Sequence, residues 1–179
     1  MRYIVIGTSG SGKSTLAREL AQALGAPHVE LDAIHWTANW TPKPQKAFIE
    51  EVEQATRGEH WVVDGNYSAV RPTVWARATH VVWLNFSRRV VFPRVLVRTI
   101  RRTVLREPLW HGNRESFRKA FFSTESILLW AFTTYSKNRT KFAALRDDAA
   151  YAHLHWHALD TPNQARQFLA GVRLRSETL

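Results

Sequence analysis

Apolar residues along the chain fall into two recurring patterns, short unbroken runs and longer helical stripes. Residues 3–6 and 61–63 are unbroken apolar runs of the length expected for strands buried on both faces. Residues 16–24 instead carry apolar side chains at intervals of three and four, the spacing of one helix face. The predicted strands are residues 3–6, 29–31, 61–65, 80–86 and 153–158.

Helical patterns occupy the segments between these strands. The longest runs from Ser87 to about Arg106, and a mostly helical stretch is expected from about residue 116 to 146. Strands that alternate with helices predict an α/β fold with a doubly wound parallel sheet, whose ligands bind beyond the carboxyl ends of the strands. At 179 residues the chain is expected to form a single domain, residues 1–179.

The segment that joins the first strand to the first helix carries the most specific motif. Its sequence is Gly-Thr-Ser-Gly-Ser-Gly-Lys-Ser-Thr, residues 7–15. This pattern is typical of a loop whose backbone N–H groups surround a nucleotide's phosphates. Lys13 is predicted to reach the β- and γ-phosphates of ATP, and Ser14 to bind Mg²⁺. The residues predicted to bind the nucleotide here are Gly7, Ser9, Gly10, Ser11, Gly12, Lys13, Ser14 and Thr15.

Two aspartates stand at the ends of neighbouring predicted strands. Asp32 follows the second strand, and Asp64 ends the third. Phosphoryl transfer needs a metal ion held in place and an oriented acceptor hydroxyl, and a carboxylate can serve either purpose. The sequence does not assign the two roles, so both residues are predicted as catalytic and as metal-supporting. The alternative for each is a structural carboxylate in a turn.

Arginines concentrate on the predicted helix from Ser87 to Arg106. Four of them, Arg94, Arg98, Arg101 and Arg102, are predicted to share one side of the helix. Guanidinium groups bind phosphate in a planar, bidentate geometry, and Arg102 and Arg106 are predicted to be catalytic. A solvated basic surface is the alternative. The loop that follows, with Pro108, Gly112 and nearby Arg114 and Arg118, suits a mobile lid, and residues 101–141 are its expected extent.

Aromatic residues cluster near the two aspartates. Trp36, Trp40 and Tyr67 could stack on a ring of the acceptor, and packing in the core is the competing interpretation. His153, His155 and His157 alternate along the last predicted strand, but we interpret them as strand residues and not as metal ligands, because no acidic or thiolate partner is near them in the sequence.

Composition narrows the class of protein only slightly. The net charge of +10 favours anionic partners, which could be nucleotides, nucleic acid or an acidic surface. With no cysteine, disulfides and thiolate metal sites are excluded. The strand begins almost at the first residue and no long apolar run exists, so we expect neither a signal peptide nor a membrane span and predict a cytoplasmic protein.

These motifs, taken in order, resemble the adenylate-kinase-like P-loop kinases. Val63-Asp64-Gly65 is similar to the hydrophobic-Asp-Gly motif of nucleoside monophosphate kinases, although Asn66-Tyr67 stands where those enzymes carry an aromatic residue and Pro-Arg. The chain more closely resembles a bacterial group of adenylate-kinase-related ATPases, some called DNA topology modulation proteins. Leu31-Asp32, Trp36, Trp40 and residues 64–67 carry this likeness.

The resemblance implies a three-layer P-loop NTPase fold with a five-stranded parallel sheet in the order 2-3-1-4-5 and a helical lid region. It also implies that adenine lies near Arg102 and the turn after the fifth strand, which contains Thr161. The acceptor is expected between Asp32 and Asp64. The further residues expected to bind it are Trp36, Trp40, Asn66, Tyr67, Arg71 and Arg98.

The leading hypothesis is therefore an ATP-dependent kinase that acts on a small hydroxyl- or phosphate-bearing acceptor, such as a nucleoside or nucleotide. A competing hypothesis is a nucleic-acid-binding regulator switched by ATP, which the net charge and the resemblance to DNA topology modulation proteins favour. Nucleic acid is the less favoured partner, because the arginines concentrate at the predicted lid and no nucleic-acid fold motif is visible. A third is an ATPase without an acceptor.

Overall fold

Five parallel strands form one sheet in the order β2-β3-β1-β4-β5. This order confirms the predicted fold class. The computed structural model describes residues 1–114 and 127–176, with side chains left out for residues 127–131. The strands are β1 (Arg2–Gly7), β2 (His28–Glu30), β3 (Trp61–Asp64), β4 (His80–Leu84) and β5 (His155–Leu159).

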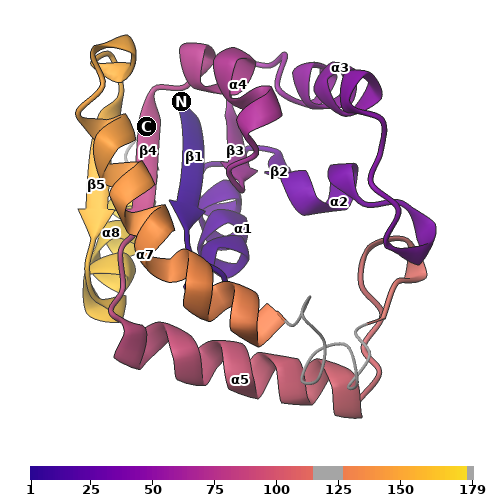
Figure 1. Cartoon of the computed structure of the whole chain (residues 1–179). Coiled ribbons are helices and arrows are strands. Elements are labelled where there is room, and N and C mark those ends of the chain that lie inside the picture. The colour runs from indigo at the N-terminus through magenta and orange to yellow at the C-terminus, as the bar shows by residue number, and fades with distance from the viewer. Residues whose placement is uncertain (115–126, 177–179) are drawn as a thin grey trace.

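Helices cover the sheet on both faces and cross its carboxyl end (Figure 1). Within the described residues, no helix is both long and apolar enough to pass through a membrane. The α-helices are α1 (Lys13–Ala23), α2 (Leu31–His35), α3 (Gln45–Ala55), α4 (Arg71–Arg77), α5 (Arg88–Val104), α7 (Ile127–Arg146) and α8 (Pro162–Ser176). Short 3₁₀ turns are η1 (Ala38–Trp40), η2 (Ser68–Val70), η3 (Trp110–Gly112) and η4 (Ala149–Tyr151).

The central strand β1 divides the core into two layers because successive side chains point to opposite faces of the sheet. Tyr3 and Val5 pack against α1, α5 and α8, whereas Ile4 and Ile6 pack against α2, α3 and α4. Burial on both faces explains why the sequence shows an unbroken apolar run here instead of alternation. The layers fix the position of the loop that leaves β1.

The carboxyl ends of the strands bring the predicted site residues to one edge. Val5 of β1 is in register with Asp64 of β3, and Asp64 is in register with Glu30 of β2. On the other side, Gly7 is in register with Leu84 of β4. Helix α5 lies across this edge (Figure 1). The phosphate loop, the acidic strand ends and the arginine helix are therefore neighbours.

Some predicted boundaries were wrong. The last strand begins at His155 and not at His153, whose ring nitrogen Nε2 instead lies 3.2 Å from the carbonyl of Trp75. The second strand ends at Glu30, because helix α2 already begins at Leu31. Helix α5 ends at Val104, shortly before the predicted end near Arg106. The start of the predicted stretch from residue 116, and with it Arg118, lies outside the described residues.

Candidate active site

The segment between β1 and α1 is a tight loop that depends on glycine. Gly10 and Gly12 adopt φ angles of 79° and 95°, which are strained for residues with a side chain, and Gly12 is the N-cap of α1. Inside the loop, Ser11 N–H donates to the carbonyl of Thr8 at 3.2 Å. The first residues of α1, whose N–H groups have no partner within the helix, therefore follow directly on the curved loop.

Helix α5 supports the loop from outside. A Cβ atom on Gly10 would lie 2.1 Å from Val95 Cγ2, so the backbone of the loop can approach the helix this closely only with glycine at position 10. Arg94 donates from Nη1 to the carbonyl of Ser11 at 3.3 Å, and Arg98 donates from Nη2 to Ser9 Oγ at 3.1 Å. Two arginines of α5 thus bond the loop itself.

A cavity of about 650 Å³ opens over this loop. Its walls combine the loop and α1 with one face of α5, the start of α8 and the carboxyl end of β2. Predicted site residues in the lining are Ser9, Gly10, Ser11, Gly12, Lys13, Ser14, Thr15, Asp32, Arg98 and Arg102. Gly7 lies beneath the loop, where an added Cβ would meet the carbonyl of Leu84 at 2.9 Å.

Asp64 lies behind the loop and is only 4% exposed. Its carboxylate accepts a hydrogen bond from the Ser14 hydroxyl, while Oδ1 has no partner. Burial raises the pKa of Asp64 above its usual range, although the ammonium of Lys13 and the bond from Ser14 act in the opposite direction. A buried carboxylate oxygen without a partner is costly, and a cation beside Ser14 would satisfy it.

Asp32, on α2, lies in the cavity lining and is half-buried. The Tyr67 hydroxyl donates to its Oδ1 at 2.5 Å. Burial raises the pKa of Tyr67, and the negative charge of Asp32 raises it further, so the phenol stays a donor. Burial also lowers the pKa of the nearby His35, which the charge of Asp32 opposes. Tyr67, which is not part of the cavity lining, therefore orients the Asp32 carboxylate by its hydrogen bond.

The arginines on and just after α5 differ in whether they line the cavity. Arg94, Arg98 and Arg102, spaced four residues apart, line the cavity. Arg101 is not in the lining and pairs with Glu107 at 2.7 Å. Arg106 is exposed, with a φ of 47° beyond the helix end, and lies outside the lining. Its catalytic role stays a prediction.

Several residues predicted to bind the acceptor stand outside the lining. Trp40 donates its indole N–H to the carbonyl of Arg114 at 3.2 Å, and its ring packs against Trp36 at 5.7 Å. Arg71 donates from Nε to Asn66 Oδ1 at 3.3 Å, and its guanidinium lies over Trp75. Each of these groups bonds or packs within the protein, so a direct contact with the acceptor is not apparent for them.

Thr161 caps helix α8. Its hydroxyl accepts from Gln164 N–H at 3.2 Å, and Gln164 Oε1 accepts from Thr161 N–H at 3.0 Å, which is a capping box. The neighbouring Asp160 Oδ1 accepts from Asn85 at 2.7 Å, tying the end of β4 to the end of β5. Pro162, and not Thr161, lines the cavity. The proposed contact of Thr161 with the nucleotide therefore rests on the resemblance alone.

Among the lining residues that were not predicted site residues, three could take part in binding, namely Arg94, Glu30 and Trp110. Arg94 was placed in the arginine cluster without a role at the site, and its four-residue spacing from Arg98 was the available signal. Glu30, which ends β2, precedes Asp32 by two residues and could have been noticed as a second carboxylate at the same strand end. Trp110 gave no signal, because only tertiary packing returns the segment after α5 to the cavity.

Comparisons with known proteins agree with this architecture. A profile of the family described as AAA domain matches residues 3–163. A gluconokinase from Sinorhizobium meliloti 1021 is 20% identical, with a TM-score of 0.51 over 99% of this chain and 94% of that one. A shikimate kinase from Bacteroides thetaiotaomicron is 16% identical, with a TM-score of 0.55 over 99% of this chain and 98% of that one. At these low identities, the likeness shows that this chain shares its fold with the two proteins. No curated protein matches the chain.

Proposed function

The chain belongs to the AAA domain family, and we propose that it is an ATP-dependent phosphotransferase that moves the γ-phosphoryl group of ATP to a hydroxyl group of a small molecule. The observation that carries this proposal is a single cavity that joins a glycine-rich phosphate loop to basic side chains and carboxylates. The two similar solved structures, a gluconokinase and a shikimate kinase, are small-molecule kinases by name, which supports the same reaction class.

The phosphate side of the cavity suits a nucleoside triphosphate. Backbone N–H groups of the loop and the start of α1 would bind the phosphate oxygens, as they do at helix N-termini generally. Lys13 Nζ now donates to the carbonyl of Thr8 at 3.3 Å, so the ammonium already lies within the loop that would hold the phosphates. Arg98 and Arg102 would neutralise charge on the transferring group.

The residues beside the loop also fit Mg²⁺. The Ser14 hydroxyl bonds the buried Asp64, whose Oδ1 has no partner. Ser14 would bind the cation, and Asp64 would orient the ligands around it; the cation itself would supply charge neutralisation for the phosphates. Mg²⁺ at a nucleotide site needs few ligands from the protein, because phosphates and waters supply the others. A larger protein cluster is not found in the described part of the chain, where no group of three or more His, Asp or Glu side chains could hold a metal ion.

Asp32 would act on the acceptor. Its carboxylate lines the cavity, and Tyr67 holds it in place. In the proposed step the acceptor oxygen forms a bond to the γ-phosphorus, and the bond from that phosphorus to the β,γ-bridging oxygen breaks. ADP leaves with the bridging oxygen, and the hydroxyl proton passes to the carboxylate of Asp32.

The test is phosphoryl transfer from ATP, with Mg²⁺, to a panel of hydroxylated small molecules, detected as product mass and as ADP. Asp32→Asn should lower the rate of transfer by about 100-fold or more, since it removes the proton acceptor. Exposed Asp148→Asn is the matched control. ADP formation equal with and without every acceptor would identify an ATPase instead. Tight, ATP-dependent binding of duplex DNA at about 0.2 M salt would favour the nucleic-acid hypothesis.

A further inference from the structure

The two sides of the cavity differ in charge. Six basic residues come from the phosphate loop and from α1, α5 and α8, where Glu19 also lines the cavity and lies 3.8 Å from Arg173. The end of β2 and the start of α2 instead contribute two carboxylates, Glu30 and Asp32. The basic residues are Lys13, Arg18, Arg94, Arg98, Arg102 and Arg166.

On this arrangement, which rests on the proposed phosphotransferase, we infer that the acceptor is an uncharged ring compound with several hydroxyl groups. It binds between Trp110 and the two carboxylates Glu30 and Asp32. A nucleoside and a neutral sugar both have this chemistry, and their phosphorylated or oxidised derivatives do not. Trp110 is then an acceptor-binding residue, and Glu30 determines specificity.

Trp110 forms the aromatic part of this acceptor side. It begins the turn η3 after α5, and it lines the same cavity as Asp32. Its ring packs edge-on against Trp40 at 6.3 Å, and Trp40 packs edge-on against Trp36 at 5.7 Å. The three rings therefore stand in a row, and of the three only Trp110 is part of the cavity lining. Trp36 and Trp40 support it.

Asn113 fixes this turn to the acidic side of the cavity. Its side chain is buried, with the residue 5% exposed, and it makes two hydrogen bonds to the segment after α2. Oδ1 accepts from Trp40 N–H at 2.9 Å, and Nδ2 donates to the carbonyl of Thr37 at 2.8 Å. His111 Nε2 lies 3.1 Å from the carbonyl of Ala33, the residue after Asp32. Trp110 is thereby held at a defined position relative to Asp32.

This combination of groups favours a neutral acceptor. Carboxylates accept hydrogen bonds from hydroxyl groups, and an indole face packs against the C–H face of a sugar or against a planar base. A phosphate or carboxylate on the acceptor would meet Glu30 and Asp32, and like charges in a partly buried site repel strongly. Repulsion of the charged analogue is an effective source of specificity.

The experiment compares acceptors in matched pairs that differ in charge. Adenosine is paired with its 3′-monophosphate, which keeps the 5′-hydroxyl, and glucose with glucuronate, which keeps the pyranose ring, in transfer reactions with ATP and Mg²⁺. For whichever pair is phosphorylated, kcat/KM should be at least about 100-fold higher for the neutral member, since two like charges oppose the anionic one. The two pairs also distinguish a nucleoside from a sugar acceptor.

Two variants locate the effect. Glu30→Gln should reduce the preference for the neutral member at least about tenfold, because one repelling charge is removed. Trp110→Ala should raise the KM for the acceptor at least about tenfold and leave the KM for ATP within about twofold, and Trp110→Phe should restore most of the loss. Phe132→Ala, a change at an exposed aromatic residue of α7, is the control and should alter neither KM.

The outcomes separate the two proposals. Preferential phosphorylation of the anionic member of either pair would overturn the neutral acceptor and leave the phosphotransferase standing. An unchanged acceptor KM in Trp110→Ala would overturn the role of Trp110 in the same way. Transfer to other hydroxylated compounds but to no member of either pair would overturn the neutral ring acceptor alone. Transfer to no compound at all, with ATP hydrolysed, would overturn the phosphotransferase as well.

Discussion

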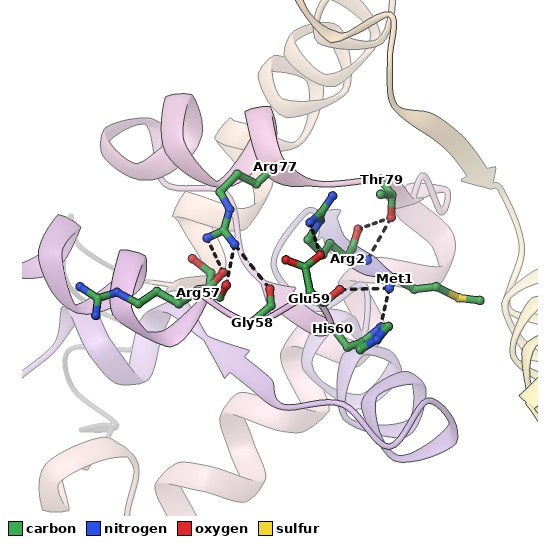
Figure 2. A network of polar contacts seen from close by, with 9 residues as sticks. Met1, Arg2, Arg57, Gly58, Glu59, His60, Arg77 and Thr79 are labelled. Atoms are coloured by element: carbon green, nitrogen blue, oxygen red, sulfur yellow. Dashed lines mark hydrogen bonds and ion pairs between the residues drawn. The ribbon is translucent and has the colours of Figure 1, made fainter.

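Polar groups at the two ends of the sheet have different surroundings. At the amino end, polar side chains and backbone groups bond to one another (Figure 2), although Arg2 Nε, His28 Nε2 and Trp61 Nε1 are buried without a partner. Thr79 Oγ1 accepts from Arg2 N–H at 3.0 Å and donates to the carbonyl of Arg2 at 3.1 Å, joining β1 to the start of β4. The guanidinium of Arg2 pairs with Glu59 at 3.0 Å.

Arg77, also at the amino end, bonds to backbone groups of the protein. Its guanidinium donates to the carbonyls of Thr56, Arg57 and Gly58 after α3, at 2.5, 2.8 and 3.5 Å (Figure 2). These carbonyls follow the last turn of the helix, where backbone acceptors need partners from outside. One side chain therefore both completes a helix end and ties α3 to α4.

At the carboxyl end, bonding capacity is left over. Asp64 is buried with an oxygen that has no partner, and arginines of α5 line an open cavity. A buried carboxylate oxygen without a partner costs stability, and the open cavity at this end leaves room for a ligand that would complete it. The bonds at the amino end stabilise the fold, and we propose that the groups at the carboxyl end bind a ligand. Four changes test this contrast.

The largest effect should follow from a change at the phosphate loop. Lys13→Ala removes an ammonium group from the cavity, and affinity for ATP with Mg²⁺ should fall about 100-fold or more, because charged hydrogen bonds to phosphate are lost. Isothermal titration calorimetry measures the affinity. Lys46→Ala, at an exposed lysine of α3, is the control, and affinity equal to that of the wild type in Lys13→Ala would refute the site.

A change at the buried carboxylate should affect catalysis more than folding. Asp64→Asn keeps the shape but removes the charge beside Ser14, so kcat should fall by about 10–100-fold, the range for a residue that orients metal ligands. The free energy of unfolding should stay the same or rise, because a buried negative charge with one unpartnered oxygen is lost. Urea titration and transfer kinetics measure the two. Marked destabilisation in Asp64→Asn, but not in Asp147→Asn, would make Asp64 a structural residue.

A change at the amino end should affect folding more than ligand binding. Arg77→Ala removes the donors to three carbonyls, and we expect the free energy of unfolding to fall by about 1–3 kcal/mol. Affinity for ATP should not change. Arg57→Ala is a matched control because only the backbone carbonyl of Arg57 takes part in this contact. A loss of ATP affinity in folded Arg77→Ala would contradict the claim that the amino end serves the fold and not ligand binding.

The smallest effect concerns acid stability at the amino end. His80, the first residue of β4, stacks on Tyr3 at 4.5 Å, and its Nδ1 lies 3.1 Å from His157 Nε2. Burial, then the neighbouring His157 and His155, lower the pKa of His80 from 6.5 to about 4. The unfolded chain therefore binds more protons than the folded one in this interval, and stability should decrease as the pH falls from about 6.5 toward 4.

Urea midpoints at several pH values measure this dependence. His80→Phe keeps an aromatic ring beside Tyr3 and removes the titrating group, so its midpoint should decrease less than that of the wild type over the same interval. Equal pH dependence in the two proteins would show that His80 does not contribute.

Local sequence was most informative where one continuous segment makes the structure. The phosphate loop could be predicted because its glycines, Lys13 and Ser14 are adjacent in sequence and need only a strand before them and a helix after them. The α/β class followed from apolar runs that alternate with helical stripes. Spacing did not decide which arginines of α5 line the cavity: Arg98 and Arg102 do, whereas Arg101, grouped with them, pairs with Glu107.

The sequence by itself determined the phosphate loop, the class of fold and the carboxylates at the strand ends, because each depends on neighbours along the chain. Only the tertiary structure decided which aromatic residue lines the cavity. Trp36 and Trp40 lie nearer Asp32 in the sequence, but Asn113 bonds across to the segment of Trp40 and brings Trp110 inward. Packing between segments more than seventy residues apart sets that choice, and no local pattern records it.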